Sequence, residues 1–160
     1  MRSQEAKVLP ESDYYVYAPS ALAARLYLYP ASVGYFYYDA GYRIRRNRFD
    51  SFLIMYIAKG SCSISIPGKS FTARAGQFVL LDCYQPHSYG SAEPWDALWL
   101  HFDGRLARDY YEEIISGHDN LLVAENMEKP LAQLQKIYDV FRTSSKILEG
   151  KLSGRITKLL

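Results

Sequence analysis

Up to Gly104 the chain alternates short apolar runs with turn residues at close intervals, a pattern typical of β-strands. Residues 49–58 form a long apolar run, as expected for a strand that is buried on both faces. Residues 62–66 and 70–73 alternate polar and apolar positions on either side of Pro67-Gly68, which predicts a hairpin. Strands are predicted at residues 23–44, 49–58, 62–66, 70–73, 77–82 and 95–102. Six or more short strands favour a barrel or a two-sheet sandwich over βαβ units.

After Gly104 the apolar positions change to a helical period. Residues 106–115 fit one helix. A second has an apolar face formed by Leu131, Leu134, Tyr138 and Phe141, and a third has apolar positions at Leu148, Leu152, Ile156 and Leu159. The pattern therefore divides the chain into a polar, proline-containing arm (residues 1–20), a β-barrel (residues 21–104) and a helical region (residues 105–160). The last helix ends on Leu160 without a cap, so we expect the chain to be part of a longer protein.

Composition narrows the function classes only slightly. A chain of 160 residues with 49% hydrophobic and 22% charged residues fits one globular domain. The net charge of +2 and a single short basic run at residues 43–48 do not favour a nucleic-acid-binding surface. Both cysteines, Cys62 and Cys83, lie in apolar, strand-like stretches. The sequence shows no apolar leader and no segment long enough to span a membrane, so a cytoplasmic location is expected.

No catalytic motif stands out. The sequence has three histidines, His87, His101 and His118. They lack the His-x-His spacing and the nearby glutamate that are typical of a catalytic metal site in a β-barrel. There is no nucleophile elbow and no glycine-rich phosphate loop. The sequence therefore predicts no catalytic residue, no metal and no cofactor.

A binding pocket is the remaining possibility. There are 15 tyrosines, more than half of them between Tyr14 and Tyr42, and such clusters form either a mixed sheet face or a ligand-facing surface. In the strand at residues 95–102, Trp95, Ala97, Trp99 and His101 share one face. Two tryptophans on either side of an alanine could stack on a sugar ring, or Trp99 could simply fill the barrel.

One arginine could add a polar contact to such a pocket. If Ile44 faces inward then Arg46 does as well, while Arg45 faces outward. A guanidinium offers a planar fork of donors to hydroxyl groups or to a carboxylate.

An ordered series of elements between residues 54 and 102 resembles the N-terminal effector-binding and dimerisation domain of AraC-type transcriptional regulators. The series is an apolar strand ending at Gly60, a turn at Gly68, Ala75-Gly76, the strand at residues 78–81, Pro86-His87-x-Tyr89, Trp95 and Trp99-x-His101-Phe102.

The resemblance implies a mainly β fold, a cupin-like (jelly-roll) β-barrel followed by C-terminal α-helices, that binds a small molecule, often a sugar, and forms a homodimer through its helices. It places Arg46 (or Arg45, with a shift of one place), Tyr89 and Trp99 at ligand positions, and the strand pattern adds Trp95. It makes His87 a residue that braces its loop. Ala97 stands where the arabinose-binding member has histidine, which argues against an arabinose-like ligand.

By resemblance, Leu131, Leu134, Tyr138 and Phe141 form the dimer interface, and DNA is bound by a C-terminal domain outside this chain. Two alternatives stay open: a standalone metal-dependent cupin enzyme acting on a sugar or small acid, and a dimerisation module with a filled barrel.

Overall fold

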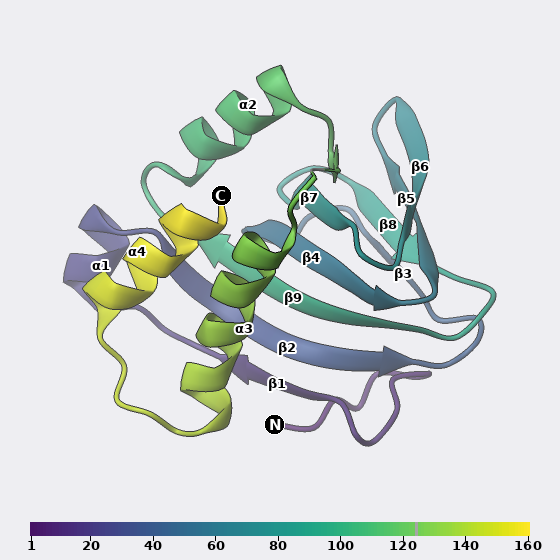
Figure 1. Cartoon of the computed structure of the whole chain (residues 1–160), viewed down its shortest axis with the longest axis horizontal. Helices are drawn as coiled ribbons and strands as arrows, with labels where there is room; N and C mark the ends of the chain where they lie inside the picture. The colour runs from purple at the N-terminus through teal and green to yellow at the C-terminus, as the bar shows by residue number, and fades with distance from the viewer. Residues whose placement is uncertain (124) are drawn as a thin grey trace.

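The computed structural model describes residues 1–123 and 125–160, which form two antiparallel sheets and four helices (Figure 1). The larger sheet has the order β1 (Asp13–Val16), β2 (Tyr29–Tyr38), β9 (Trp95–Asp103), β4 (Phe52–Lys59), β7 (Phe78–Asp82) and β10 (Leu121–Leu122). The smaller sheet has the order β3 (Arg43–Arg46), β8 (His87–Gly90), β5 (Ser61–Ile66) and β6 (Lys69–Arg74). The prediction of a mainly β, cupin-like jelly-roll fold followed by helices is confirmed.

The predicted hairpin is β5–β6, which projects at one end of the molecule (Figure 1). Gly68 in its turn has a φ of 74°, a conformation that glycine adopts without strain. The long apolar run proves to be β4, which lies between β9 and β7 and is buried on both faces, as predicted.

The two faces of the larger sheet belong to two separate apolar clusters. The inner face, toward the smaller sheet, contributes Leu53, Met55, Ala97 and Trp99 to one cluster. The outer face contributes Ile54, Leu98, Leu100 and Phe102 to the other, which includes residues of the helices. Strand alternation therefore sends neighbouring side chains of β4 and β9 into different layers.

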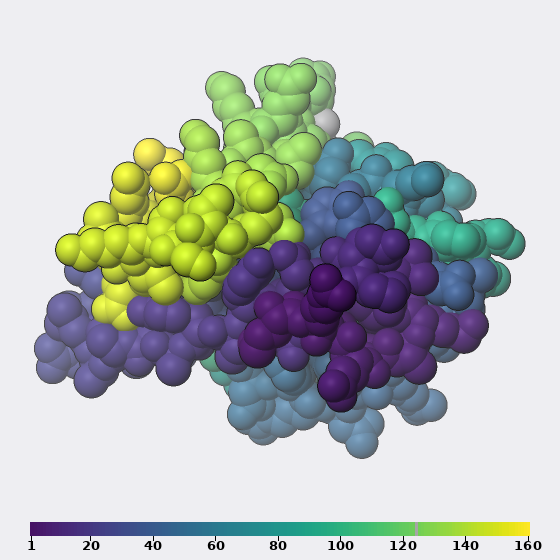
Figure 2. Space-filling model, turned by 90° about the horizontal axis from the view of Figure 1, so that it is seen from below, coloured from purple at the N-terminus to yellow at the C-terminus, as the bar shows by residue number. Residues whose placement is uncertain are grey.

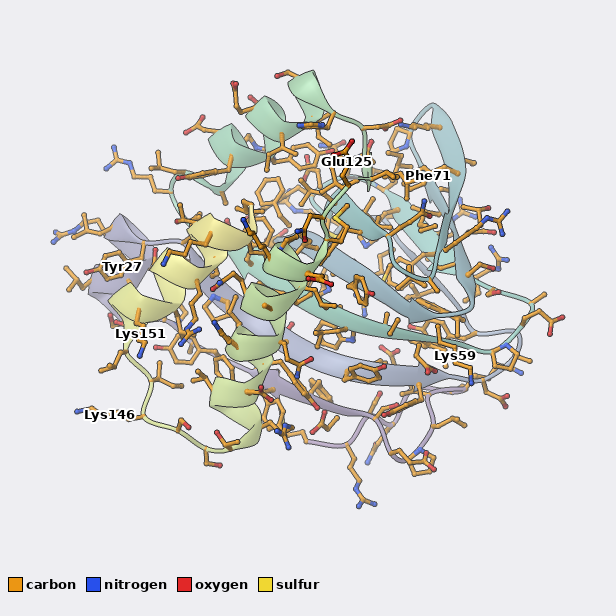
Figure 3. All side chains as sticks on the ribbon, viewed as in Figure 1. Tyr27, Lys59, Phe71, Glu125, Lys146 and Lys151 are labelled. Atoms are coloured by element: carbon orange, nitrogen blue, oxygen red, sulfur yellow. The ribbon has the colours of Figure 1, made fainter. Side chains whose placement is uncertain are left out.

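The helices α2 (Ala107–Gly117), α3 (Glu128–Arg142) and α4 (Glu149–Leu159) lie on the outer-face side of the larger sheet (Figure 1). Side chains lie between these helices and the sheet, whereas Lys146, in the loop before α4, points away from the molecule (Figure 3). The helical pattern after Gly104 was therefore interpreted correctly.

The apolar stripe of α3 packs inside the chain. Leu134, Tyr138 and Phe141 are buried in the outer-face cluster, and Leu131 is half-buried against it. The dimer interface expected from these residues stays a prediction, which their packing against the chain's own sheet does not favour. Most exposed positions of α3, such as Gln135 and Lys136, are polar.

The strand predicted at residues 23–44 was wrong at its start, where the chain forms the short helix α1 (Ala21–Leu26). Ser20 caps this helix, since its Oγ accepts a hydrogen bond from the Ala23 N–H at 3.1 Å. A serine cap followed by alanine, leucine and arginine predicts a helix start. The signal was missed because the residues that follow are rich in aromatic side chains, which favour strands.

The N-terminal arm is partly built into the sheet. Its residues 13–16 form β1, which pairs antiparallel with β2. Before β1, the Leu9 N–H donates to the Tyr37 carbonyl and the Asp39 N–H to the Lys7 carbonyl, both at 2.8 Å. The arm is therefore fastened along β2, and the domain boundary at residue 20 stays a prediction.

Candidate functional site

A cavity of about 490 Å³ lies between the N-terminal arm and the inner face of the larger sheet. Its walls come from the arm, from β1–β3, β8 and β9, and from the segment after β3. The lining residues are Ser3, Gln4, Glu5, Tyr14, Val16, Ser32, Phe36, Tyr38, Tyr42, Arg46, Phe49, Tyr89, Trp99 and His101. The volume falls in the range of pockets for small ligands, and the walls are largely aromatic.

Arg46 supplies the fixed positive charge of the cavity. In β3 the register pairs Ile44 with Tyr89 and Arg46 with His87, so this row faces inward. The Arg46 guanidinium lies 4.7 Å from the centre of the Phe49 ring, a cation–π distance. Its Nη2 lies 3.6 Å from Glu5 Oε1.

Glu5 closes one side of the cavity from the arm. Besides the ion pair with Arg46, its Oε2 accepts a hydrogen bond from the Tyr42 hydroxyl at 2.9 Å. Burial raises the pKa of Tyr42, and the nearby Tyr89 and Glu5 raise it further, so the phenol stays protonated and able to donate. Figure 2 shows the N-terminal residues spread across one face of the molecule, beside the C-terminal helices.

Trp99 and His101 form the floor of the cavity on β9. The Trp99 ring meets Phe36 edge-on at 5.0 Å between centroids, and His101 lies 4.7 Å from Phe49. His101 Nδ1 is 2.8 Å from Ser51 Oγ, within hydrogen-bond distance. Burial, with a smaller contribution from Arg46, lowers the pKa of His101 to about 3, so the ring is neutral at physiological pH.

Strand β1 connects the cavity with the helices. Tyr14 and Val16 line the cavity. Asp13, next to Tyr14, accepts hydrogen bonds from Tyr138 of α3 at 2.5 Å and from Tyr15 at 2.8 Å. Beyond the strand, the Tyr17 hydroxyl donates to Glu149 of α4 at 2.6 Å. These hydrogen bonds join β1 to α3, and the residue that follows β1 to α4.

Comparison with protein families gives a match to the AraC-like ligand binding domain over residues 29–160. The chain belongs to this family. Comparison with curated proteins gives no match.

Several solved structures resemble this AraC-like domain. A conserved protein of unknown function from Streptococcus pyogenes is 20% identical with a TM-score of 0.48, over 66% of this chain and 81% of that chain. A cupin 2 conserved barrel domain protein from Leptotrichia buccalis is 13% identical with a TM-score of 0.49, over 81% and 51%. The Cupin_2 domain of an XRE family transcriptional regulator from Enterobacter cloacae is 14% identical with a TM-score of 0.45, over 59% and 98%. At these scores the similarities carry no argument about function.

Three of the five predicted ligand residues lie together on the cavity of this AraC-like domain: Arg46, Tyr89 and Trp99. Whether they bind a ligand stays a prediction. These three side chains lie close together because they belong to the inward-facing positions of β3, β8 and β9.

The other two predicted residues do not line this cavity, and their role in ligand binding stays a prediction. Trp95 is fully buried and stacks on Tyr38, with 4.0 Å between the ring centroids. Tyr38 lines the cavity, so its ring lies between Trp95 and the cavity. Arg45 pairs across the strands with Ser88 and lines a second, polar hollow, which Arg46 also lines. Of the two arginines given by the resemblance, Arg46 lines the cavity and Arg45 does not, and contact of either with a ligand stays a prediction.

His87 is buried beside the loop before β8. Its Nδ1 donates to the Gln85 carbonyl at 2.9 Å, and its ring lies parallel to Tyr89 at 6.5 Å. Among the described residues its Nε2 has no hydrogen-bond partner, and burial lowers the pKa of the ring. These contacts fit the predicted role as a brace of the loop, which stays a prediction.

Sequence reasoning missed most of the cavity wall, including Glu5, Tyr14, Tyr42 and His101. His101 had a signal, since it shares the predicted inward row of Trp99. The tyrosine cluster signalled Tyr14 and Tyr42 only as a group. Glu5 had none, because its partners are remote in sequence.

Three further observations concern the part of the chain that the structure describes. Within residues 1–123 and 125–160, no group of three or more His, Cys, Asp and Glu side chains is placed to hold a metal ion. Burial raises the pKa of both Cys62 and Cys83 to about 12, which disfavours a reactive thiolate. No helix in these residues has the length and apolar character needed to cross a membrane.

Proposed function

We propose that this chain is the effector-sensing domain of an AraC-type transcription regulator, with a small molecule bound in the cavity between the arm and the inner sheet face. The observation that carries the proposal is the cavity of about 490 Å³, in which one arginine faces aromatic walls. Family membership supports the ligand-binding role. On this proposal the chain is a sensor and not an enzyme, and it acts in the cytoplasm.

A ring-shaped effector, with a sugar as the candidate from the sequence, fits the chemistry of the walls. Trp99 and Tyr89 offer aromatic surfaces, and Tyr42, Ser32 and Arg46 offer hydrogen-bonding groups that hydroxyls could meet. Burial raises the pKa of Tyr89, as it does that of Tyr42, so both phenols are neutral.

The effector would influence the helices through β1. Ligand contact with Tyr14 or Val16 favours one position of the strand, and Asp13 links that position to Tyr138 of α3. An effector that binds one position of β1 more tightly shifts the equilibrium toward it by that difference in affinity. In a complete regulator the helices would pass the change to a homodimer partner and to a DNA-binding domain outside this chain.

A thermal-shift screen of mono- and oligosaccharides tests the proposal. A ligand at 100 times its dissociation constant should stabilise the domain by about 2.7 kcal/mol. Trp99→Ala should then weaken binding of any hit by about 1–3 kcal/mol, because one aromatic wall is lost. The control Tyr37→Ala removes an aromatic ring of β2 that does not line the cavity, and should leave affinity unchanged. Unchanged affinity in Trp99→Ala with an intact fold would refute the pocket assignment.

Two further measurements address the other parts of the proposal. Light scattering on the chain over a range of concentrations should show a dimer, and a chain that stays monomeric at high concentration would contradict dimerisation through this domain. Metal analysis of the purified protein addresses the enzyme alternative. Stoichiometric iron, zinc or manganese bound through His87 and His101 would overturn the sensor proposal.

A further inference from the structure

The charges around the cavity are divided between the barrel wall and the arm. Within residues 1–123 and 125–160, the wall contributes one cationic side chain, Arg46, and no carboxylate. His101 adds no charge, because burial lowers its pKa to about 3. Glu5, the carboxylate that lines the cavity, comes from the arm. Without Glu5, the wall would present an uncompensated positive charge to whatever the cavity holds.

The Glu5 side chain contacts two polar groups of the cavity wall. It reaches Arg46 Nη2 at 3.6 Å and takes a hydrogen bond from the Tyr42 hydroxyl at 2.9 Å. The distance to Arg46 exceeds that of a charge-assisted hydrogen bond, which is about 2.8 Å. Since both partners are partly exposed to solvent, this ion pair contributes little to stability.

The stretch of arm around Glu5 is fastened at both ends but only lightly in its middle. The Met1 amine donates to the Tyr14 carbonyl at 2.8 Å, and Lys7 Nζ donates to the Ala40 carbonyl at 2.7 Å. Between these anchors, in the part of the chain that the structure describes, the hydrogen bond and ion pair from residues 2–6 to the barrel wall both come from the Glu5 side chain. Glu5 can therefore leave Arg46 without releasing either anchor.

We propose that the effector is a small acid whose carboxylate replaces Glu5 on Arg46 and Tyr42, so that Glu5 acts as a built-in competitor in the empty domain. This inference rests on the proposed function and specifies its ligand class. A sugar acid meets both this requirement and the aromatic walls, and so does an aromatic acid. A neutral sugar has no group that compensates Arg46.

The exchange favours a free acid for geometric reasons. A ligand carboxylate inside the cavity can take up a two-pronged arrangement on the guanidinium, which the 3.6 Å approach of Glu5 does not achieve. The Tyr42 hydroxyl, kept protonated by its raised pKa, can donate to either carboxylate. The displaced Glu5 can become fully hydrated, because its side chain is already exposed at the surface.

Matched acid and neutral probes test the proposal by calorimetry at fixed ionic strength: D-glucuronate against D-glucose, and benzoate against benzamide. We expect at least one acid to bind more tightly than its neutral partner. Glu5→Gln should then raise the affinity for that acid by up to about fivefold, since a competing surface ion pair is removed. Arg46→Met should lower it by about tenfold or more, because a charged hydrogen bond is lost.

Two matched variants serve as controls. Glu11→Gln makes the same charge change in the arm at an exposed residue that does not line the cavity, and Arg45→Met makes the same change as Arg46→Met on the outward row of β3. Neither should change the affinity for the acid. Arg46→Lys keeps the charge without the fork and should show an intermediate loss if Arg46→Met folds poorly.

The outcomes separate this inference from the proposed function. If D-glucose or benzamide binds as tightly as its acid, depends on Trp99 and is unaffected by Glu5→Gln, the acid inference is wrong and the sensor proposal stands. If no probe and no member of the saccharide screen binds to wild type or to Glu5→Gln, both are contradicted. Equal effects of Arg45→Met and Arg46→Met would also refute the acid inference, since they would indicate attraction by net charge only.

Discussion

The two faces of the larger sheet are built from the same strands, but they carry different kinds of side chain. On β9 the outer row of Leu98, Leu100 and Phe102 belongs to an apolar cluster with residues of the helices. The inner row includes Trp99 and His101, which line a cavity. The outer face is covered by the helices, beside which lies a mainly apolar pocket of about 410 Å³ lined by Ile54, Phe78 and Leu159. The inner face toward β1 is covered by the arm, beneath which lies the cavity of about 490 Å³ with Arg46 and aromatic walls.

This difference separates stability from binding within one sheet. Apolar side chains that fill a space stabilise the fold, since each buried methylene contributes about 0.8 kcal/mol. Tyrosine, histidine and arginine around an open space contribute less to the core and keep hydrogen-bonding groups ready for a ligand. Substitutions on the outer face should therefore reduce stability, and those on the inner face should reduce affinity.

The largest expected effect comes from the outer face. Leu100→Ala removes a side chain that is fully buried, and should lower the free energy of unfolding by about 2–5 kcal/mol. The affinity of the folded variant for a ligand should stay unchanged, because Leu100 does not line the cavity. Urea denaturation and calorimetry measure the two quantities. Leu22→Ala, at an exposed leucine of α1, is the control and should change stability by no more than about 0.5 kcal/mol.

Gly34→Ala should affect both properties, because Gly34 lies where the cavity wall and β1 meet. A Cβ there would come within 2.6 Å of Trp99 Cζ2 and 2.7 Å of the Asp13 carbonyl oxygen. Overpacking of this kind costs about 1–3 kcal/mol. Gly154→Ala in α4 is the matched control. Its Cβ would meet no atom within 4 Å, and it should stabilise the helix by about 0.5–1 kcal/mol. A Gly34→Ala variant as stable as wild type would contradict the close packing of β1.

The neutral His101 on the inner face predicts a pH dependence of stability. Burial lowers the pKa of His101 from 6.5 to about 3, so between these values the unfolded chain binds a proton that the folded chain does not. Stability is therefore lost as the pH falls below about 6.5, by about 1.4 kcal/mol per pH unit, or about 2 kcal/mol at pH 5. His101→Gln should reduce this slope between pH 7 and pH 5, whereas His118→Gln, at an exposed histidine, should not. Equal slopes for wild type and His101→Gln would refute the buried neutral histidine.

The smallest effect is expected at the link between the two faces. Tyr138→Phe removes the hydrogen bond to Asp13 and should lower the free energy of unfolding by about 1 kcal/mol. It should also reduce the change in hydrogen exchange that a cavity ligand produces in α3. Tyr110→Phe in α2 removes a hydroxyl that does not contact β1 and should change neither. If ligand-induced protection of α3 persists fully in Tyr138→Phe, the signal follows another route.

Local patterns predicted much of this fold and part of the site. The period of two along β9 placed Trp99 and His101 on one face, and the period of the helices located α2–α4. Periodicity does not say what a face meets, so the stripe with Leu134 was assigned to a second subunit although it packs on the chain's own sheet. For the same reason Trp95 was assigned to the cavity, since its contact with Tyr38 depends on how β2 and β9 pair.

The covering of the cavity could not be predicted from local patterns. The contacts of Glu5 with Tyr42 and Arg46 join residues far apart in the chain, and residues 2–6 show no periodicity. These contacts depend on how the arm is fastened along β2, which is a property of the assembled sheet.

The central claim is that the effector binds on the inner face, under the arm. Because the chain has 2 tryptophans, the indole N–H signals of Trp99 and Trp95 in a nitrogen-15 NMR spectrum, assigned with Trp99→Phe and Trp95→Phe, report on the cavity and on the filled core. Titration with a ligand from the screens should shift the Trp99 signal and leave the Trp95 signal nearly unchanged. A bound ligand that shifts neither signal, or Trp95 alone, would contradict the claim.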